Sequence, residues 1–356
     1  MRRTRVRRPS PHAAGYRWRS SCGTPVQVTD FVTVIALGGT IAMARPADGS
    51  TGAVPALDVD ELLASVPGLD EVDIKLRTIA FRALPGASVG FDDLTALAEL
   101  ITAEIDAGAR GVVVTQGTDT IEETAYFLDT SVLDGAPVVV TGAMRNPSLA
   151  GADGPANLLA AVQVAASEQA DGLGCVVVFA DQVHAARYVS KAHSASIAAF
   201  VSPNTGPIGY VVEGKFRLLN RPADVLKVYV PQGAPEPTIG LVTVTLGDDG
   251  TVLRAIGEAV DGMVVAAFGA GHVPVAMVEP LTELAQRMPV ILASRTGAGP
   301  VLAETYGFPG SEQDLLRRGL IGAGFLSPVK ARILLRQLLA ARAGIDDVRK
   351  AFLGEE

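Results

Sequence analysis

Short apolar runs alternate with amphipathic segments along most of the chain from residue 31 onward. Each run is almost continuously apolar, as expected for parallel strands that are covered by helices on both faces. The first four runs cover residues 31–37, 111–115, 137–141 and 174–180. This alternation predicts an α/β fold with a mainly parallel, doubly wound sheet.

The segment 92–107 is predicted to be a helix, because apolar side chains recur along it at the spacing of one helical face. These side chains are Leu94, Leu97, Ile101 and Ile105. Asp92 and Asp93 stand in the first turn, where carboxylates interact favourably with the helix dipole.

The pattern changes after residue 210. Segment 218–236 contains Pro222, Pro231, Gly233 and Pro235, a composition that interrupts both helices and strands and predicts a linker. Beyond it, apolar runs at 238–246, 262–268 and 289–294 and a helical pattern at 328–343 predict further α/β structure. We therefore expect a larger N-terminal domain over residues 30–217 and a smaller C-terminal α/β domain over residues 237–356.

Length and composition agree with two globular domains, because 356 residues exceed what one hydrophobic core usually organises and 48% of the residues are apolar. No apolar run reaches the roughly 20 residues that span a bilayer, and the chain start lacks the apolar segment of a secretory signal. Cys22 and Cys175 are too few for a disulfide framework or a zinc site. These features predict a cytoplasmic protein that contacts no membrane and holds no metal.

Charge is unevenly distributed along the chain. Residues 1–29 contain 7 arginines and no acidic residue, so all 38 acidic residues lie in the rest of the chain. A folded body with that balance repels phosphate backbones, which argues against nucleic acid as a partner. The basic segment 1–29 is predicted to be a disordered extension outside the fold.

Polar residues follow three of the predicted strands. The first strand is followed by Gly38, Gly39 and Thr40, the second by segment 116–120, and the third by segment 142–145. Ligands of open parallel sheets bind beyond the carboxyl ends of the strands, so Thr40, Thr118 and Asp119 should meet at one edge. On pattern alone, a threonine at such a turn can equally be a helix cap.

Nucleotide binding finds little support in the glycine-rich turns. Segment 38–40 lacks the Gly-Lys-Ser/Thr ending of a phosphate-binding loop, and segment 269–274 has Pro274 where the dinucleotide fingerprint needs its third glycine.

A serine hydrolase is a second alternative, because residues 86–90 read Gly-Ala-Ser-Val-Gly, the pattern of a nucleophile elbow at Ser88. Three histidines lie downstream: His184, His193 and His272. However, Pro85 sits poorly at the end of a central strand.

Longer motifs carry a family resemblance. Residues 38–42 read Gly-Gly-Thr-Ile-Ala, residues 116–128 read Gln-Gly-Thr-Asp-Thr-Ile-Glu-Glu-Thr-Ala-Tyr-Phe-Leu, and residues 142–145 and 152–158 read Gly-Ala-Met-Arg and Ala-Asp-Gly-Pro-Ala-Asn-Leu. In this order they resemble the bacterial-type L-asparaginase family from about residue 31 to the C-terminus. The resemblance implies hydrolysis of the side-chain amide of L-asparagine to L-aspartate and ammonia through an acyl-threonine intermediate, without a cofactor.

The resemblance also implies roles for individual residues. Thr40 is the expected nucleophile, Asp119 holds the α-amino group of the substrate, and Lys191 is paired with Thr118. The substrate-binding positions are Gly39, Gly86, Ala87, Gly117, Thr118, Asp119 and Ala143. Lys191 is expected to be largely buried, because burial disfavours the charged form of a lysine. The family further implies a homodimer or homotetramer acting on a small-molecule substrate, L-asparagine or L-glutamine.

The chain departs from the family pattern at two places. A serine that contacts the substrate carboxylate is replaced at Gly86 or Ala87, and the mobile loop over residues 43–57 lacks the tyrosine that orients the nucleophile, with Gly52 near its place. Tyr306 from either subunit is a candidate substitute.

Two other functions stay open besides the serine hydrolase. One is the related subunit of a tRNA-dependent amidotransferase, which normally carries a sizeable N-terminal domain. The other is a non-catalytic amino-acid-binding module.

Overall fold

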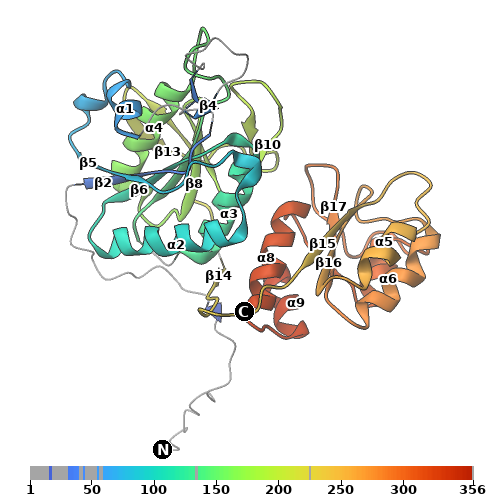
Figure 1. Cartoon of the computed structure of the whole chain (residues 1–356). Helices are drawn as coiled ribbons and strands as arrows, with labels where there is room; N and C mark the ends of the chain where they lie inside the picture. Colours follow the sequence, from blue (N-terminus) through green and yellow to red (C-terminus); the bar gives the residue numbers. More distant parts are fainter. Residues whose placement is uncertain are drawn as a thin grey trace, which may run out of the picture.

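Two main sheets with flanking helices form the fold in the computed structural model (Figure 1). The structure describes residues 16–17, 31–39, 43–44, 54–55, 59–132, 135–223 and 226–354. The larger sheet has eight strands in the order β13-β12-β9-β8-β7-β6-β2-β5. Their bounds are β2 (Phe31–Ala36), β5 (Lys75–Ala80), β6 (Gly111–Thr115), β7 (Val138–Thr141), β8 (Cys175–Phe179), β9 (Gln182–Ala185), β12 (Gly209–Val212) and β13 (Lys215–Leu218). The strands from β8 to β5 are parallel, whereas β9, β12 and β13 are antiparallel. The predicted mainly parallel sheet is confirmed.

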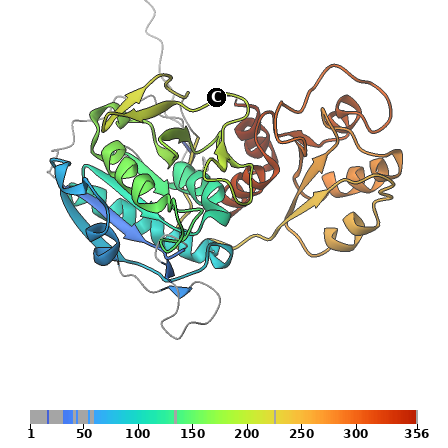
Figure 2. The same ribbon diagram turned by 90° about the horizontal axis from the view of Figure 1, so that it is seen from above.

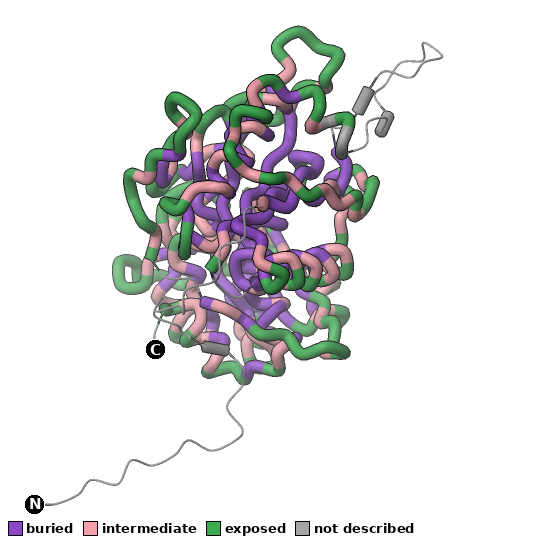
Figure 3. The backbone as a smooth tube through the Cα atoms, turned by 90° about the vertical axis from the view of Figure 1, so that its left-hand side faces the viewer, coloured by how far each residue is buried: buried purple, intermediate pink, exposed green. Residues whose placement is uncertain are grey.

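Helices cover both faces of this sheet, which explains why its strands are apolar along their whole length. One face packs against α2 (Phe91–Asp106) and α3 (Ile121–Ser131), and the other against α1 (Val59–Ala64) and α4 (Gly154–Ala166). Alternate residues of one strand point to opposite faces: Val112 and Val114 pack on the side of α2 and α3, and Val113 packs on the side of α4. Figure 3 shows the resulting buried interior beneath an exposed rim of loops.

The C-terminal sheet is smaller and entirely parallel, with the order β15-β16-β17-β18. It consists of β15 (Ile239–Thr243), β16 (Gly262–Ala267), β17 (Val290–Ser294) and β18 (Ile321–Gly322). One face packs against α5 (Thr251–Gly257), α6 (Val278–Ala285) and α7 (Glu312–Arg317), and the other against α8 (Pro328–Ala340) and α9 (Ile345–Leu353). The predicted second α/β domain is therefore confirmed as a smaller parallel sheet.

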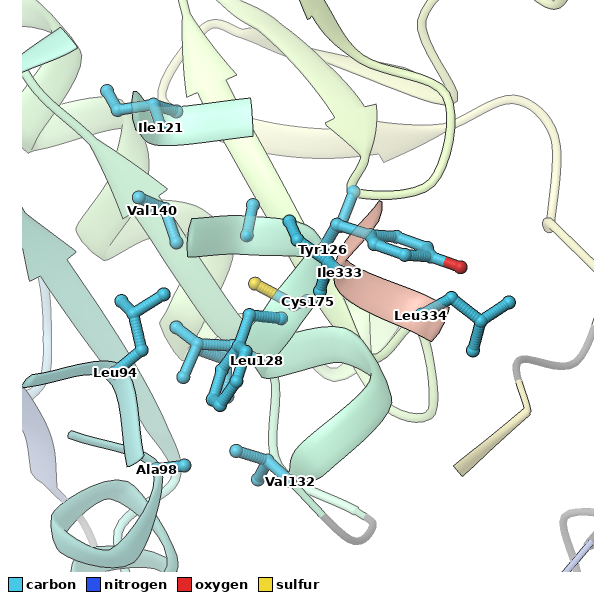
Figure 4. Close-up of a cluster of buried hydrophobic side chains, with 14 of the residues drawn as sticks. Leu94, Ala98, Ile121, Tyr126, Leu128, Val132, Val140, Cys175, Ile333 and Leu334 are labelled. Atoms are coloured by element: carbon cyan, nitrogen blue, oxygen red, sulfur yellow. The ribbon is translucent and has the colours of Figure 1, made fainter. Parts of the chain in front are cut away.

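Helix α8 joins the two sheets, because it lies between the C-terminal sheet and α3 (Figure 2). Its Ile333 and Leu334 belong to the same buried cluster as Tyr126 and Leu128 of α3 (Figure 4). Gln337 crosses the same interface: its Oε1 accepts from Thr130 Oγ1 at 2.7 Å, and its Nε2 donates to Ser131 Oγ at 2.7 Å. One hydrophobic core thus extends through both parts of the chain.

Three two-stranded pairings complete the strands: β1 (Tyr16–Arg17) with β14 (Lys227–Val228), β3 (Met43–Ala44) with β4 (Val54–Pro55), and β10 (Ser190–Lys191) with β11 (Phe200–Val201). The 3-10 helices of the described residues are η2 (Leu69–Glu71), η3 (Gly86–Ser88), η4 (Thr118–Thr120), η5 (Glu168–Ala170) and η6 (Val275–Met277). Among the helices of the described ranges, none is long and apolar enough to span a membrane.

The predicted domain boundaries remain a prediction, although two short strands fall within the segments assigned to the linker and the extension. β14 lies inside the predicted linker 218–236, where Leu226 and Val228 are buried in the large core. β1 lies inside the predicted extension 1–29 and pairs with β14. The other residues of that extension lie outside the described part of the chain.

Candidate active site

The strand order places a topological switch point beside β2. The chain passes from β2 to its neighbour β5 on one side and then to β6 on the other side, so the connections diverge between β2 and β6. Such a switch point is where ligands of doubly wound sheets bind, beyond the carboxyl ends of the strands. Leu37 N, directly after β2, donates to Thr115 O at the end of β6 at 2.9 Å, so the two turns start side by side.

Three glycines bring the backbones of three turns into direct contact at this edge. A Cβ added to Gly39 would lie 2.2 Å from Gly117 N, and one added to Gly117 would lie 2.6 Å from Gly86 N. No side chain fits at such distances, which is why the sequence has glycine at each position. The structure thus brings together three of the predicted substrate-binding residues, whose main chains pack directly on one another.

A side-chain hydrogen bond holds two of these turns together. Thr120 Oγ1 donates to Gly86 O at 2.9 Å and accepts from Gln116 Nε2 at 3.3 Å. Gln116 is fully buried, so this contact lies beneath the edge. Gln116 and Thr120 both lie in the motif that carries the family resemblance, although no role was predicted for either residue.

Thr118 and Asp119 both accept a hydrogen bond from the same atom, the side-chain nitrogen of Lys191. Lys191 Nζ donates to Thr118 Oγ1 at 2.9 Å and to Asp119 Oδ1 at 2.8 Å. Thr118 is buried, and the Lys191 side chain is 15% exposed, in agreement with the expected burial, whereas the Asp119 side chain is 65% exposed. The Asp119 carboxylate is therefore open to solvent, whereas the Lys191 amine and the Thr118 hydroxyl beside it are largely buried.

The position of Lys191 depends on a local hairpin and on helix α3. Lys191 pairs with Phe200 across β10 and β11, and Ala192 N donates to Ala199 O at 2.7 Å. The main-chain N–H of Lys191 also points to Glu122 Oε1, at 3.4 Å, in the first turn of α3. Since Thr118 and Asp119 directly precede that helix, Glu122 ties the lysine strand to the threonine turn.

Ala143 lies in a buried turn after β7 that two polar side chains shape. Asp153 accepts from Met144 N at 3.0 Å and from Arg145 N at 2.8 Å. Asn157 Nδ2 donates to Gly142 O at 3.0 Å, and Asn157 Oδ1 accepts from Ala180 N at 3.0 Å. These residues, quoted in the sequence motif without a role, fix the backbone around Ala143.

Thr40 and most of segment 43–57 lie outside the described residues, and so does Gly52. Gly39, the residue before Thr40, is described and is buried against Gly117. Ala87 lies exposed beside Gly86 in η3. Tyr306 would serve as a substitute for the absent tyrosine only within hydrogen-bond reach of Thr40, which no described contact tests; its ring lies in the C-terminal domain, edge-on to His272 at 4.9 Å.

The serine elbow considered as an alternative at Ser88 is not formed. Strand β5 ends at Ala80, whereas Ser88 lies in the exposed 3-10 turn η3 well beyond that strand end. The histidines are engaged elsewhere: His184 Nδ1 with Ser202 Oγ at 2.9 Å, His193 Nδ1 with Ala195 N at 3.0 Å, and His272 Nε2 with Glu312 Oε2 at 3.1 Å. Within the described ranges, no group of three or more His, Cys, Asp or Glu side chains is arranged around a metal site.

Comparison with known proteins identifies the family. The description "Asparaginase, N-terminal" matches residues 31–224, and "Glutaminase/Asparaginase C-terminal domain" matches residues 238–352. The chain belongs to the asparaginase family. This membership confirms the resemblance and the amidohydrolase class, and it favours neither a serine hydrolase nor a binding module.

Relatives of the asparaginase family align over nearly the full chain. A probable L-asparaginase of Deinococcus radiodurans is 37% identical over 330 residues, covering 90% of this chain and 96% of its own. An L-asparaginase of Bacillus licheniformis is 35% identical over 326 residues, covering 89% of this chain and 98% of its own. The crystal structure of a probable cytoplasmic L-asparaginase from Campylobacter jejuni superposes with a TM-score of 0.81 at 31% identity, covering 91% of this chain and 99% of that one.

Proposed function

We propose that this chain is an L-asparaginase that hydrolyses the side-chain amide of L-asparagine to L-aspartate and ammonia. The observation that carries the proposal is the contact of Lys191 Nζ with both Thr118 Oγ1 and Asp119 Oδ1 at the switch-point edge, in a chain of the asparaginase family. A sheltered amine beside a hydroxyl suits proton transfer, and an exposed carboxylate suits recognition of an ammonium group.

In the first half of the proposed reaction, the Thr40 hydroxyl attacks the side-chain amide carbon of asparagine. The amide C–N bond breaks, the nitrogen takes up the proton released by the hydroxyl and leaves as ammonia, and an ester joins the acyl group to Thr40. Thr40 follows Gly39 directly, so the packing of Gly39 on Gly117 supports its assignment to this edge.

In the second half, a water molecule attacks the ester. Thr118 and Lys191 receive a proton from that water, the bond to Thr40 breaks, and the Thr40 oxygen regains a proton as aspartate leaves. Lys191 Nζ lies 2.9 Å from Thr118 Oγ1, within hydrogen-bond reach for this proton transfer, and that contact supports the role.

Recognition and charge stabilisation use the rest of the edge. The carboxylate of Asp119 pairs with the α-ammonium group of the substrate. Main-chain N–H groups near Gly39 and Ala143 stabilise the oxyanion that forms in each half-reaction. The close backbone packing at Gly39, Gly86 and Gly117 supports this assignment, because it holds the main chains of three turns together at this edge.

Ammonia release from L-asparagine, with L-glutamine assayed in parallel, tests the proposed function. We expect release by the unmodified chain, almost none by Thr40→Ala, and a loss of about 10²–10⁴-fold in kcat for Lys191→Met, the usual contribution of positioned proton transfer. Thr205→Ala is the matched control, since that exposed hydroxyl donates only to Gly206 O nearby. Intact turnover in Thr40→Ala would exclude the acyl-threonine mechanism.

We further propose a homodimer or homotetramer in the cytoplasm, acting on a small-molecule substrate without a cofactor. The family resemblance and the cytoplasmic relative from Campylobacter jejuni support this assignment. Light scattering after size-exclusion chromatography would measure the oligomeric state, and a monomer with full activity would contradict the proposal. Activity that survives dialysis against a chelator is the expected result for a cofactor-free enzyme.

A further inference from the structure

Lys330 occupies an unfavourable position in helix α8. It is the third residue of that helix, where a cation opposes the helix dipole, and it is only 1% exposed, where an ammonium group loses its hydration. Burial lowers the pKa of Lys330 to about 8, while Glu122 and Asp129 act in the opposite direction. A residue that is disfavoured both by the helix end and by burial requires compensating contacts.

Those contacts lead to the lysine strand of the candidate site. Lys330 Nζ donates to the carbonyl oxygen of Val189, two residues before Lys191. The Glu122 carboxylate, which attracts the Lys330 ammonium group, also faces the main-chain N–H of Lys191 at 3.4 Å. Lys330 thus reaches from the C-terminal domain to one end of the segment that carries Lys191, and Glu122 contacts the other end.

We propose that Lys330, together with Glu122, is a positioning residue that fixes the Val189–Lys191 segment so that Lys191 Nζ reaches Thr118 Oγ1. The inference rests on the proposed function of Lys191. The two anchors act on the main chain on opposite sides of Ser190, at Val189 O and Lys191 N. The short β10 pairing of two residues cannot alone fix a long side chain, so the anchors limit where its amine lies.

A purely structural role for Lys330 is the competing explanation, and Gln337 provides the comparison. Gln337 lies seven residues further along α8, so it stands on the same helix face. It is also 1% exposed and also crosses to the N-terminal domain. Its partners are Thr130 and Ser131 at the far end of α3, away from the lysine strand.

The test compares Lys330→Met with Gln337→Met, both assayed with L-asparagine well below their melting temperatures. We expect both variants to melt earlier. Only Lys330→Met should lose kcat, by about 10- to 100-fold, the effect of a misplaced catalytic group, while its KM stays within about twofold. A native kcat in Lys330→Met, or an equal loss of kcat in both variants, would overturn the proposal.

A second variant keeps the test decisive if Lys330→Met does not fold. Glu122→Ala removes the other anchor from a partly exposed helix start, and the same loss of kcat at nearly constant KM is expected. A native kcat in Glu122→Ala would then refute the positioning role. Lys191→Met distinguishes a failure of the proposed function from a failure of the positioning role. If Lys191→Met retains turnover, the proposed function of Lys191 is wrong. If Lys191→Met is inactive while Lys330→Met keeps its native kcat, only the positioning role of Lys330 is wrong.

Discussion

Asp119 and Lys191 share a contact of 2.8 Å but differ in their access to solvent. The lysine side chain is 15% exposed and the carboxylate side chain is 65% exposed. A substrate can therefore approach the free side of Asp119 without displacing the lysine. The exposure of this carboxylate fits recognition, and the shelter of the amine fits proton transfer.

Asp119→Asn is expected to weaken mainly those substrates that carry an α-amino group, because the partner of the ammonium group is lost. We expect a rise in KM of about 10-fold or more for L-asparagine, the scale of one charge-assisted contact. The monoamide of succinic acid, which lacks the α-amino group, is the control substrate. Equal effects on both substrates would contradict the recognition role.

His184 makes the stability of the fold depend on pH. Its side chain is 1% exposed, Nδ1 contacts Ser202 Oγ, and Nε2 has no hydrogen-bond partner among the described residues. Burial, with the charge of Lys330 nearby, lowers its pKa from 6.5 to about 4. The unfolded chain therefore binds a proton that the folded chain rejects between these values, and stability falls as pH drops through this window.

We expect this histidine to lower the free energy of unfolding by about 2 kcal/mol between pH 7 and pH 5. Urea unfolding of the unmodified chain and of His184→Gln at both pH values measures the effect. The variant has no group that titrates at this position, so its stability should fall less between the two pH values. An identical fall in both proteins would show that His184 does not titrate as described.

At the level of single residues, the sequence motifs predicted the group that converges on Lys191. They could not predict Lys330, because its role depends on a contact with Val189, which lies 141 residues earlier in the chain. A buried lysine in the first turn of a helix is a detectable anomaly only once burial is known. The position of Thr40 remains a prediction, since it lies outside the described residues.

Among the elements, the turns beyond β2 and β6 are held by close backbone contact. Gly117 has φ −65° and ψ 139°, a conformation that alanine adopts without strain. An added Cβ would nevertheless lie 2.6 Å from Gly86 N and 2.8 Å from Gly86 Cα. Any side chain at Gly117 must therefore push two turns apart.

Gly117→Ala is expected to destabilise the fold by about 1–3 kcal/mol, the usual cost of overpacking, and to reduce kcat because Thr118 moves with the turn. Gly307→Ala is the matched control, because its Cβ would meet only the Gln313 side chain, at 3.6 Å. Thermal melting and ammonia release measure both effects. A Gly117→Ala variant that behaves like the control would show that the turns can separate freely.

The sequence pattern predicted the four central strands of the large sheet, whose faces are both covered, and missed β9 and the half-exposed strands β5, β12 and β13. Each of the four runs first predicted contains a strand of the large sheet, whereas β5 was not predicted. β5 lies at the sheet edge, and its Lys75 and Arg77 differ in exposure from their apolar neighbours. Strands β12 and β13 are similarly half-exposed, so their alternating sequences resemble loops more than buried runs.

For the whole molecule, the two sheets share a core through α8. Ile333 is 1% exposed in that shared cluster. We expect Ile333→Ala to lower the free energy of unfolding by about 2–5 kcal/mol, as cavities in cores do, and to leave a single melting transition. Val252→Ala on α5, a residue that is 61% exposed, is the control and should change little. Calorimetry that resolves two transitions, with only one shifted, would contradict the shared core.

Two-domain organisation could be predicted from the chain, but the docking of the domains could not. The helical pattern at 328–343 predicted a helix at the end of the second domain, and α8 is found at 328–340. Periodicity reveals that a helix has an apolar face, but not which partner covers it. Here opposite sides of α8 are covered by the C-terminal sheet and by α3.

The large sequence separation between α8 and its partner α3 also affects folding during synthesis. The bond between Thr130 and Gln337 joins residues 207 positions apart. A ribosome delivers the strands of the large sheet well before it delivers this helix, at a rate of about 5–20 residues per second. During that interval the part of α3 that packs against Ile333 and Leu334 of α8 lacks this partner, and we expect the nascent chain to depend on a chaperone until α8 emerges.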